Sequence, residues 1–312
     1  MVWEVLGAVI GAGFASGQEL AAFFARFGGW SWPGVAAAAL CAGLLLARVL
    51  RLGPEVFHRR SWQATFLLLA LFAGGAMVAA AGELAALCLS LRGARWLGMA
   101  LMLAAGMAGA RRQSRMLAII SRVLAAALMV MLLLCLTLPG QRAARVEPAA
   151  SPLVTALSAL IHGVCYGGFN LALAAPMAAE EAAGMAGPAR RRAPVWVGLV
   201  LGVMVALGNL VLLRHPLQLH SALPLVRLTA AFGQAGFYGC CVVMLLAVLT
   251  TLIASLRDLA ALLTPRWRPL IAPATAAAAL LGFSGIVSRV YPVLGGLCAA
   301  LLLLPARWQA HG

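Results

Sequence analysis

A glycine-rich polar stretch lies near the start of the chain, at residues 7–20, and reads GAVIGAGFASGQEL. It places Ser16, Gln18 and Glu19 in surroundings that are otherwise apolar. An acid inside a membrane costs about 2.5 to 3.5 kcal/mol unless it faces the protein interior and finds a partner. We therefore predict that Glu19 is a coupling or gating residue. It can take up a proton, pair with a substrate ammonium group, or brace the chain beside it.

A second stretch of the same kind lies at residues 163–176 and reads GVCYGGFNLALAAP. Aligning Gly13 with Gly168 places a glycine cluster at the centre of both segments, with Tyr166 and Asn170 beside the second. Each glycine costs about 0.8 to 1 kcal/mol in a helix interior. We predict that both helices break there, which lipid tolerates only where the backbone lines a cavity or is buried in protein. The alternative is close helix packing through small residues.

The composition identifies the elements that must position these groups. The chain has 312 residues, of which 64% are hydrophobic and 10% are charged, with a mean hydropathy of +1.00. Soluble domains carry about 25% charged residues. The chain is thus predicted to be an all-α polytopic membrane protein that lies in a lipid bilayer. Its net charge of +15 comes from arginines between apolar runs, which favours membrane topology over binding of nucleic acid.

Signals for chemistry on a substrate are missing from the sequence. It contains no HExxH or GxSxG motif and no paired aspartates in facing spans, so we predict that the protein is not an enzyme. The seven cysteines lack CxxC spacing and the five histidines lack metal-ligand spacing. Neither a disulfide framework nor a cofactor is expected.

Ten apolar spans are predicted when the chain is divided at arginine clusters and at Pro, Gly and Trp residues. A span needs about 20 apolar residues. The predicted spans are 3–26, 31–50, 63–90, 96–110, 115–138, 153–182, 195–213, 232–256, 269–286 and 290–306.

Most arginines fall in the even-numbered connections and after the last span, which predicts cytoplasmic N- and C-termini in a bacterial inner membrane. The triplet at residues 190–192 contributes much of this bias, and we interpret it as a topology anchor in preference to a lipid-binding site. Glu83, Glu180, Glu181 and Asp258 are expected to form gate or surface ion pairs.

Ten spans form two sets of five within a single transmembrane domain, residues 1–312. A polar connection, residues 139–152, separates a first repeat at residues 3–138 from a second at residues 153–306. Because five is odd, a repeated unit must enter the membrane the second time in the opposite orientation. The expected fold is a five-plus-five inverted repeat with discontinuous helices 1 and 6.

Three stretches carry a resemblance to a known family: GAVIGAGFASGQELAAFFARFG, YGGFNLALAAP and GFSGIVSRVYPVLGG. They resemble the YkvI-like bacterial membrane proteins, which are related to the amino acid, polyamine and organocation transporter superfamily with its LeuT-type fold. The resemblance extends over essentially the whole chain. It implies a secondary transporter with a substrate site between spans 1, 3, 6 and 8.

The resemblance also implies a sodium site. In sodium-coupled relatives a cation lies between backbone carbonyls of span 1 and an A-x-x-[ST]-[ST] pattern of span 8. Ala247, Thr250 and Thr251 match this pattern, and Gly7 and Ile10 fall at the carbonyl positions. Sodium is a hard cation, and an unwound helix supplies neutral oxygen ligands for it. Alternatively, the threonines bond to the preceding turn of their own helix.

We therefore expect a sodium-coupled, or else proton-coupled, importer of an amino acid or a related small zwitterion or amine. The alternative is a non-transporting sensor or partner-binding subunit on the same fold. Sodium is the expected coupling ion, and a small molecule is the expected partner. The predicted substrate-binding residues are Gly11, Ala12, Gly13, Phe14, Ser16, Tyr166, Phe169 and Asn170.

Overall fold

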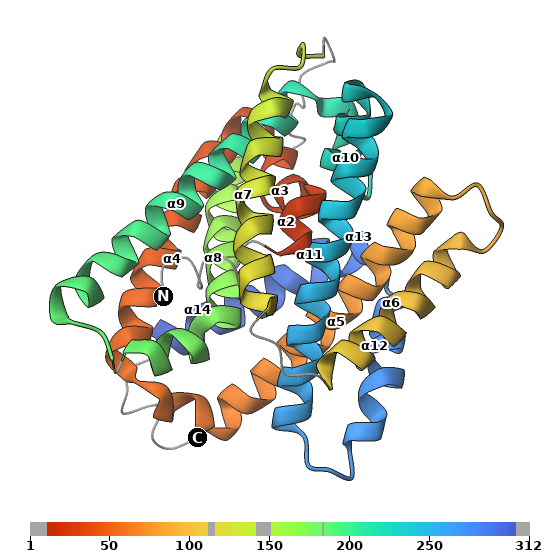
Figure 1. Cartoon of the computed structure of the whole chain (residues 1–312). Helices are drawn as coiled ribbons and strands as arrows, with labels where there is room; N and C mark the ends of the chain where they lie inside the picture. The colour runs from red at the N-terminus through yellow and green to blue at the C-terminus, as the bar shows by residue number, and fades with distance from the viewer. Residues whose placement is uncertain (1–10, 112–115, 142–150, 183, 304–312) are drawn as a thin grey trace.

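The computed structural model describes residues 11–111, 116–141, 151–182 and 184–303. Every regular element in these ranges is helical (Figure 1). Six stretches are long and apolar enough to cross a membrane, which supports the prediction of a multi-pass membrane protein. They are Ala25–Leu52, Arg60–Cys88, Pro152–Ala182, Gly187–Arg214, Pro224–Leu262 and Phe283–Leu303.

Most of the long helices follow the predicted spans closely in position, whereas α9 begins earlier than predicted. They are α4 (Trp32–Leu52), α5 (Arg60–Cys88), α6 (Ala94–Ala110), α7 (Met116–Leu136), α8 (Pro152–Ala182), α9 (Gly187–Arg214) and α11 (Gly233–Leu262). Short elements make up much of the remainder. They are α2 (Ala12–Ser16), α3 (Gln18–Phe23), η1 (Ala25–Ser31), η2 (Pro54–His58), η3 (Pro216–Gln218), α10 (Pro224–Thr229), η4 (Ala230–Phe232), η5 (Arg268–Leu270), α12 (Ile271–Ala279), α13 (Phe283–Gly285), η6 (Ile286–Val290) and α14 (Tyr291–Leu303).

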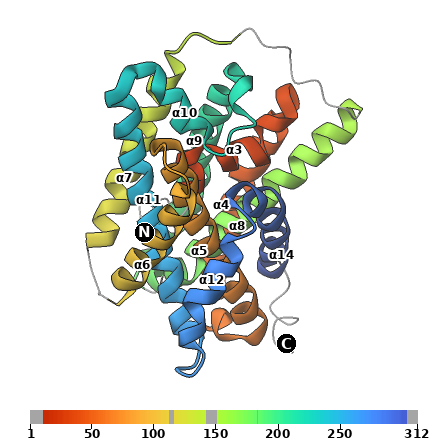
Figure 2. The same cartoon turned by 90° about the vertical axis from the view of Figure 1, so that its right-hand side faces the viewer.

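The helices pack in two groups. In the first, α8 packs against α4 and α14, and α4 also packs along α9. In the second, α5 contacts α6, α11 and α12. The short helices α2 and α3 lie between the groups, because α2 contacts α5 and α11 while α3 contacts α8 and α9. Figures 1 and 2 both show this placement in the middle of the bundle.

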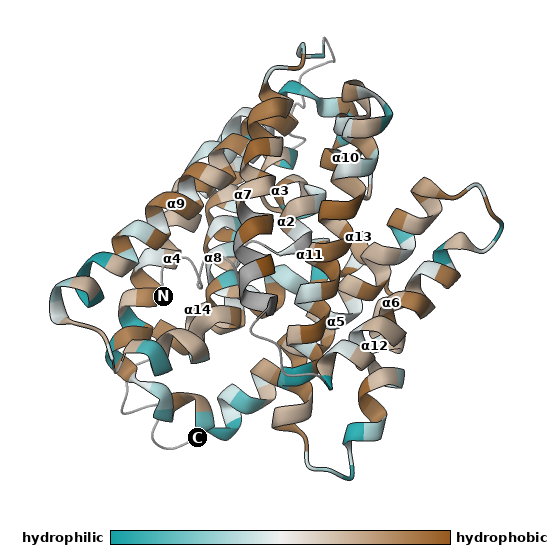
Figure 3. Ribbon diagram, in the orientation of Figure 1, coloured by the Kyte–Doolittle hydropathy of each residue, from teal (hydrophilic) through white to brown (hydrophobic). Residues whose placement is uncertain are grey.

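Hydrophobic residues run along the helices, and hydrophilic residues gather at the connections (Figure 3). The α4–α5 and α11–α12 connections lie toward the lower side of this view, whereas the α5–α6 and α9–α10 connections lie toward the upper side. This is the distribution expected of a chain whose successive helices cross an apolar layer.

The predicted break in the first segment is present. Gly11 is extended, and α2 ends at Gly17, where φ is +80°, before α3 begins. L-amino acids with a side chain rarely adopt this φ, so glycine permits the break. The predicted discontinuity of the sixth span is wrong. Helix α8 runs from Pro152 to Ala182 without interruption, although it contains Pro176.

Close packing explains the glycines of α8. A Cβ atom at Gly163 would overlap the backbone carbonyl of Gly34, and one at Gly168 would overlap the carbonyl of Gly295. A Cβ at Gly167 would lie 3.1 Å from the carbonyl oxygen of Ala38. Here glycine lets α4 and α14 approach the α8 backbone, so the small-residue packing alternative applies to this helix.

The start of α9 differs from the predicted start of the seventh span. The helix begins at Gly187 and not near residue 195. The arginine triplet at residues 190–192 therefore lies within the helix. Long arginine side chains reach the polar interface from a helix end, which explains why charged residues extend this helix beyond its apolar run.

Candidate functional site

The break between α2 and α3 is buried. A Cβ atom at Gly17 would lie 2.6 Å from Leu225 Cγ, so α10 covers the break directly. Ser16 Oγ donates a hydrogen bond to the Gly13 carbonyl at 2.8 Å, and the backbone N–H of Gln18 donates to Ser16 Oγ at 3.0 Å. The Ser16 hydroxyl thus satisfies backbone groups on both sides of Gly17 and holds the chain in its broken conformation.

Glu19 folds back across this break. Its side chain is buried, and its carboxyl group occupies the space where a side chain of Gly13 would lie. The carboxyl lies close to the Tyr166 hydroxyl. Neither Glu19 Oε2 nor the Tyr166 hydroxyl has a hydrogen-bond partner of good geometry among the described residues. Buried polar groups without partners are costly and rare.

Aromatic rings pack around Tyr166, whose hydroxyl lies close to the carboxyl. The Tyr166 ring lies 5.3 Å from the ring of Phe23 and 5.0 Å from that of Phe24, both with edge-to-face geometry. The Phe169 ring stacks on Tyr291 with a centroid distance of 4.0 Å. All five rings are buried. The structure therefore brings Tyr166 close to Glu19, and it stacks Phe169 on Tyr291, which the sequence did not single out.

Asn170 and Phe14 have less direct roles in this cluster. Asn170 donates a hydrogen bond from Nδ2 to the Tyr166 carbonyl at 3.0 Å, within α8, and Phe14 is buried in the hydrophobic core. Gly11 and Ala12 form the start of α2, with the Ala15 N–H donating to the Gly11 carbonyl at 3.1 Å. Within span 1 the contacts with α8 come from α3, whereas the predicted residues of α2 lie against α5, α10 and α11.

Of the predicted sodium ligands, Thr251 contacts the backbone of span 1 at Gly11, a residue that was predicted to bind the substrate. A Cβ atom at Gly11 would lie 3.5 Å from Thr251 Oγ1, so the extended backbone before α2 contacts this hydroxyl of α11. Thr250 Oγ1 donates to the Ala247 carbonyl at 3.0 Å, which is the local bond expected of a threonine in a membrane helix. Gly7 and Ile10 lie outside the described residues.

A separate cavity has a volume of about 280 Å³. It lies between the start of α5 and the last turns of α8 and α11. Trp62, Phe66, Pro176, Glu180 and Asp258 are among the residues that line it. Asp258 follows Thr251 by seven residues of α11, so both side chains share one face of the helix about two turns apart.

The remaining titratable residues lie away from the break or pack locally. Arg95 Nη2 and Glu83 Oε1 form an ion pair at 2.6 Å, which matches the interpretation of Glu83 as a salt-bridged acid. His162 Nδ1 lies 2.8 Å from the Ser158 carbonyl oxygen, and its ring packs against Phe27. No group of three or more metal-binding side chains occurs among the described residues.

Sequence reasoning missed Tyr291, Asn209 and Thr275. Tyr291 lies in the stretch GFSGIVSRVYPVLGG, and it is one of only three tyrosines in the chain. Asn209 and Thr275 are completely buried polar residues within apolar helices. A polar residue inside an apolar run is the available signal, because such residues usually face the protein interior.

Comparisons with known proteins do not assign this arrangement to a family. No protein-family model and no curated protein matches the chain. The function must be argued from the site itself.

Proposed function

We propose that this protein is a secondary active transporter that couples sodium entry to import of an amino acid or a related small zwitterion or amine. One observation carries the proposal. A buried, broken helix places its extended backbone at Gly11 against the Thr251 hydroxyl of α11, between two packed groups of helices. Irregular backbone inside a membrane protein is characteristic of ion and solute sites.

The chemistry at Thr251 suits sodium. Sodium requires several oxygen ligands, and hydroxyl and carbonyl oxygens supply them without a net charge that must be desolvated. The Thr250 hydroxyl donates a hydrogen bond to the Ala247 carbonyl. A hydroxyl oxygen that donates in this way keeps its lone pairs, so Thr250 remains able to act as a cation ligand. Gly7 and Ile10 would supply the backbone carbonyls.

The cluster around Glu19 suits a small solute with polar and apolar parts. Tyr166 and Glu19 offer polar atoms without partners among the described residues. Phe169 and Tyr291 offer stacked rings for the apolar part. In this proposal the backbone from Gly11 to Ser16 contacts one end of the solute, and the rings of α8 contact the other.

The packing supports a five-plus-five arrangement of ten spans. Three pairs of helices five places apart in the proposed order fall in the same group: α4 with α9, α5 with α11, and α6 with α12. An inverted repeat produces such a division, since equivalent helices occupy equivalent places. Transport would then proceed by alternating access, with one group moving against the other around α2 and α3.

The two sides of the break differ. Leu225 of α10 covers Gly17, whereas the 280 Å³ cavity is lined by Asp258, which lies two turns of α11 away from Thr251. With cytoplasmic termini, the cavity would open to the cytoplasm of a bacterial cell. The structure would then correspond to a state closed to the outside.

Sodium-driven uptake into proteoliposomes tests the proposal. Candidate solutes are first found by thermal-shift screening of amino acids and amines, each with sodium or potassium, because a ligand stabilises the state that binds it. We expect uptake to require an inward sodium gradient and to fall at least about tenfold in the Thr250→Ala/Thr251→Ala double variant.

Thr137→Ala is the matched control. Thr137 Oγ1 also bonds to a carbonyl of its own helix, that of Leu134 at 2.7 Å, but it is exposed at the end of α7. Its loss should leave uptake unchanged. Solute binding without flux under any gradient would reject transport and favour a sensor, whereas uptake that ignores sodium but follows a proton gradient would reject only the coupling ion.

A further inference from the structure

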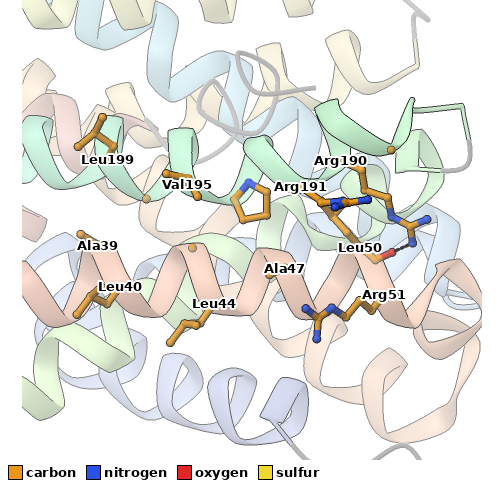
Figure 4. A pocket seen from close by; sticks show the side chains of 14 residues that line it. Ala39, Leu40, Leu44, Ala47, Leu50, Arg51, Arg190, Arg191, Val195 and Leu199 are labelled. Atoms are coloured by element: carbon orange, nitrogen blue, oxygen red, sulfur yellow. Dashed lines mark hydrogen bonds between the residues drawn. The ribbon is translucent and has the colours of Figure 1, made fainter.

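A long groove runs along the outside of the bundle between α4 and α9. Its volume is about 780 Å³, and fourteen residues line it (Figure 4). One wall comes from residues 39–51 of α4 and the other from residues 187–199 of α9. It is separate from the break, because none of its lining residues belongs to α2 or α3.

Most of the groove is apolar. At its floor the two helices approach closely: a Cβ atom at Gly43 would lie 3.1 Å from the Pro194 carbonyl oxygen, and one at Gly198 would lie 2.8 Å from that of Ala39. Larger side chains rise at its edges, where Leu40, Leu44, Val195 and Leu199 are exposed. Small residues at the floor and larger apolar residues at the edges form an apolar channel that can hold a hydrocarbon chain.

One end of the groove is strongly basic. Figure 4 shows Arg51 of α4 and Arg190 and Arg191 of α9 together at this end, opposite Leu40 and Leu199. None of the fourteen lining residues is acidic. Arg190 donates a hydrogen bond to the Leu50 carbonyl and so joins the two helices, while Arg51 and Arg191 are exposed.

The backbone of α9 adds to this positive charge. The helix begins at Gly187, which itself lines the basic end, and its first turn contains no acidic residue and no side-chain cap. The first N–H groups of a helix lack partners within the helix and carry partial positive charge. Pro188, the second residue of the helix, has no N–H, so the arginines and the Gly187 N–H are the donors that this end of the groove offers to an anion.

The length of the groove matches one leaflet of a bilayer. Leu40 and Arg51 are eleven residues apart on α4, which corresponds to about 16 Å at 1.5 Å per residue. Half of a hydrocarbon core is about 15 Å thick. A ligand with an anionic head at Arg51 would thus reach Leu40 with one extended acyl chain.

We infer that this groove binds an anionic phospholipid, with its phosphate at Arg51 and Arg191 and an acyl chain along the apolar floor. Basic pockets between transmembrane helices bind anionic lipid headgroups by the same combination of features. The arginine triplet therefore has a binding role in addition to the topology role that the sequence predicts. The inference depends on membrane insertion but not on transport.

Native mass spectrometry of the full chain in detergent tests this inference. The probes are dioleoylphosphatidylglycerol and dioleoylphosphatidylcholine, which share acyl chains and differ in headgroup charge. We expect the phosphatidylglycerol to bind at least about tenfold more tightly, and the Arg51→Gln/Arg191→Gln variant to remove this preference. Each arginine near anionic lipid contributes about 1 kcal/mol of binding free energy, so two arginines account for an affinity difference of about 30-fold.

Matched variants distinguish a built site from general positive charge. Arg266→Gln/Arg268→Gln removes the same charge from the exposed α11–α12 connection, and it should retain the preference. Ala47→Trp fills the groove and should weaken binding of both lipids, with circular dichroism checking that the helices persist. Equal binding of the two lipids, or equal loss in both arginine variants, would overturn the inference. Displacement of phosphatidylglycerol by millimolar inorganic phosphate would show an anion site without an acyl-chain site.

Discussion

The carboxyl group of Glu19 lies against the α-carbon of Gly13, on the opposite side of the break at Gly17. The contact connects two short helices that no continuous backbone hydrogen-bond ladder joins. A side chain at Gly13 would take the place of the carboxyl, so the two residues depend on each other. The contact gives Glu19 the bracing role considered for it, at a position close to the Tyr166 hydroxyl.

Substitution of Gly13 by alanine should destabilise the fold. The added methyl group overlaps the Glu19 carboxyl, and overpacking of this kind costs about 1 to 3 kcal/mol. Gly239→Ala is the control, because Gly239 lies exposed in α11 with nothing within 4 Å of the added atom. Thermal unfolding in detergent should show a lower midpoint for the first variant and an unchanged or higher one for the second. Equal midpoints would contradict the close contact.

Replacement of Glu19 by glutamine should preserve both folding and most of the uptake. Glutamine has nearly the shape of the carboxyl and keeps the contact with Gly13, whereas Glu19→Ala leaves a void beside Gly13 and the Tyr166 hydroxyl. Void formation around a truncated side chain costs several kcal/mol at most sites. Uptake at pH 6 and pH 8 provides the measurement. A folded Glu19→Gln protein without uptake would instead assign the residue a charge or proton role.

The hydrogen bond between Asn209 and Ser31 should contribute measurably to stability. Asn209 Nδ2 donates to Ser31 Oγ at 2.9 Å, and Ser31 Oγ donates to the Gly28 carbonyl at 2.8 Å, all within buried surroundings. Side-chain hydrogen bonds between membrane helices contribute about 0.6 kcal/mol on average. A double-mutant cycle of Asn209→Ala and Ser31→Ala should give a coupling energy of about this size. A value of zero would contradict the pairing of α9 with η1.

The ion pair between Glu83 and Arg95 should contribute little. Its oxygen and nitrogen lie 2.6 Å apart, but the arginine side chain is 55% exposed. Exposed ion pairs contribute about 0.2 to 1 kcal/mol and are screened by salt. Arg95→Gln should therefore lower the unfolding midpoint slightly at low ionic strength. At about 0.5 M salt, where exposed charges are largely screened, the midpoint should not change. A large, salt-independent loss would indicate a packing role for this side chain.

Local patterns were enough to predict the helices. Apolar runs such as residues 31–50 and 153–182 correspond closely to α4 and α8, because a backbone in lipid must form its hydrogen bonds within each segment. The break in the first segment was also predictable. Gly11, Gly13 and Gly17 lie close together beside Ser16, and these residues weaken a helix whatever surrounds it.

The same local argument was wrong for α8. Glycine has two roles in a membrane helix: it permits a break in the helix, and it permits close contact with another helix. The sequence pattern is the same for both roles. Gly163 and Gly168 serve contacts because α4 and α14 happen to pack there. The sequence of one segment does not show which other helix will pack against it.

The sequence by itself determined that this is a membrane protein of long helices with a weak point near Gly17, since composition and helix propensity are properties of the chain alone. Only the tertiary structure decided which groups meet: Glu19 with Gly13, Phe169 with Tyr291, and Arg51 with Arg191 along one groove. The physical reason is that burial, close contact and shared charge depend on distances between segments remote in sequence.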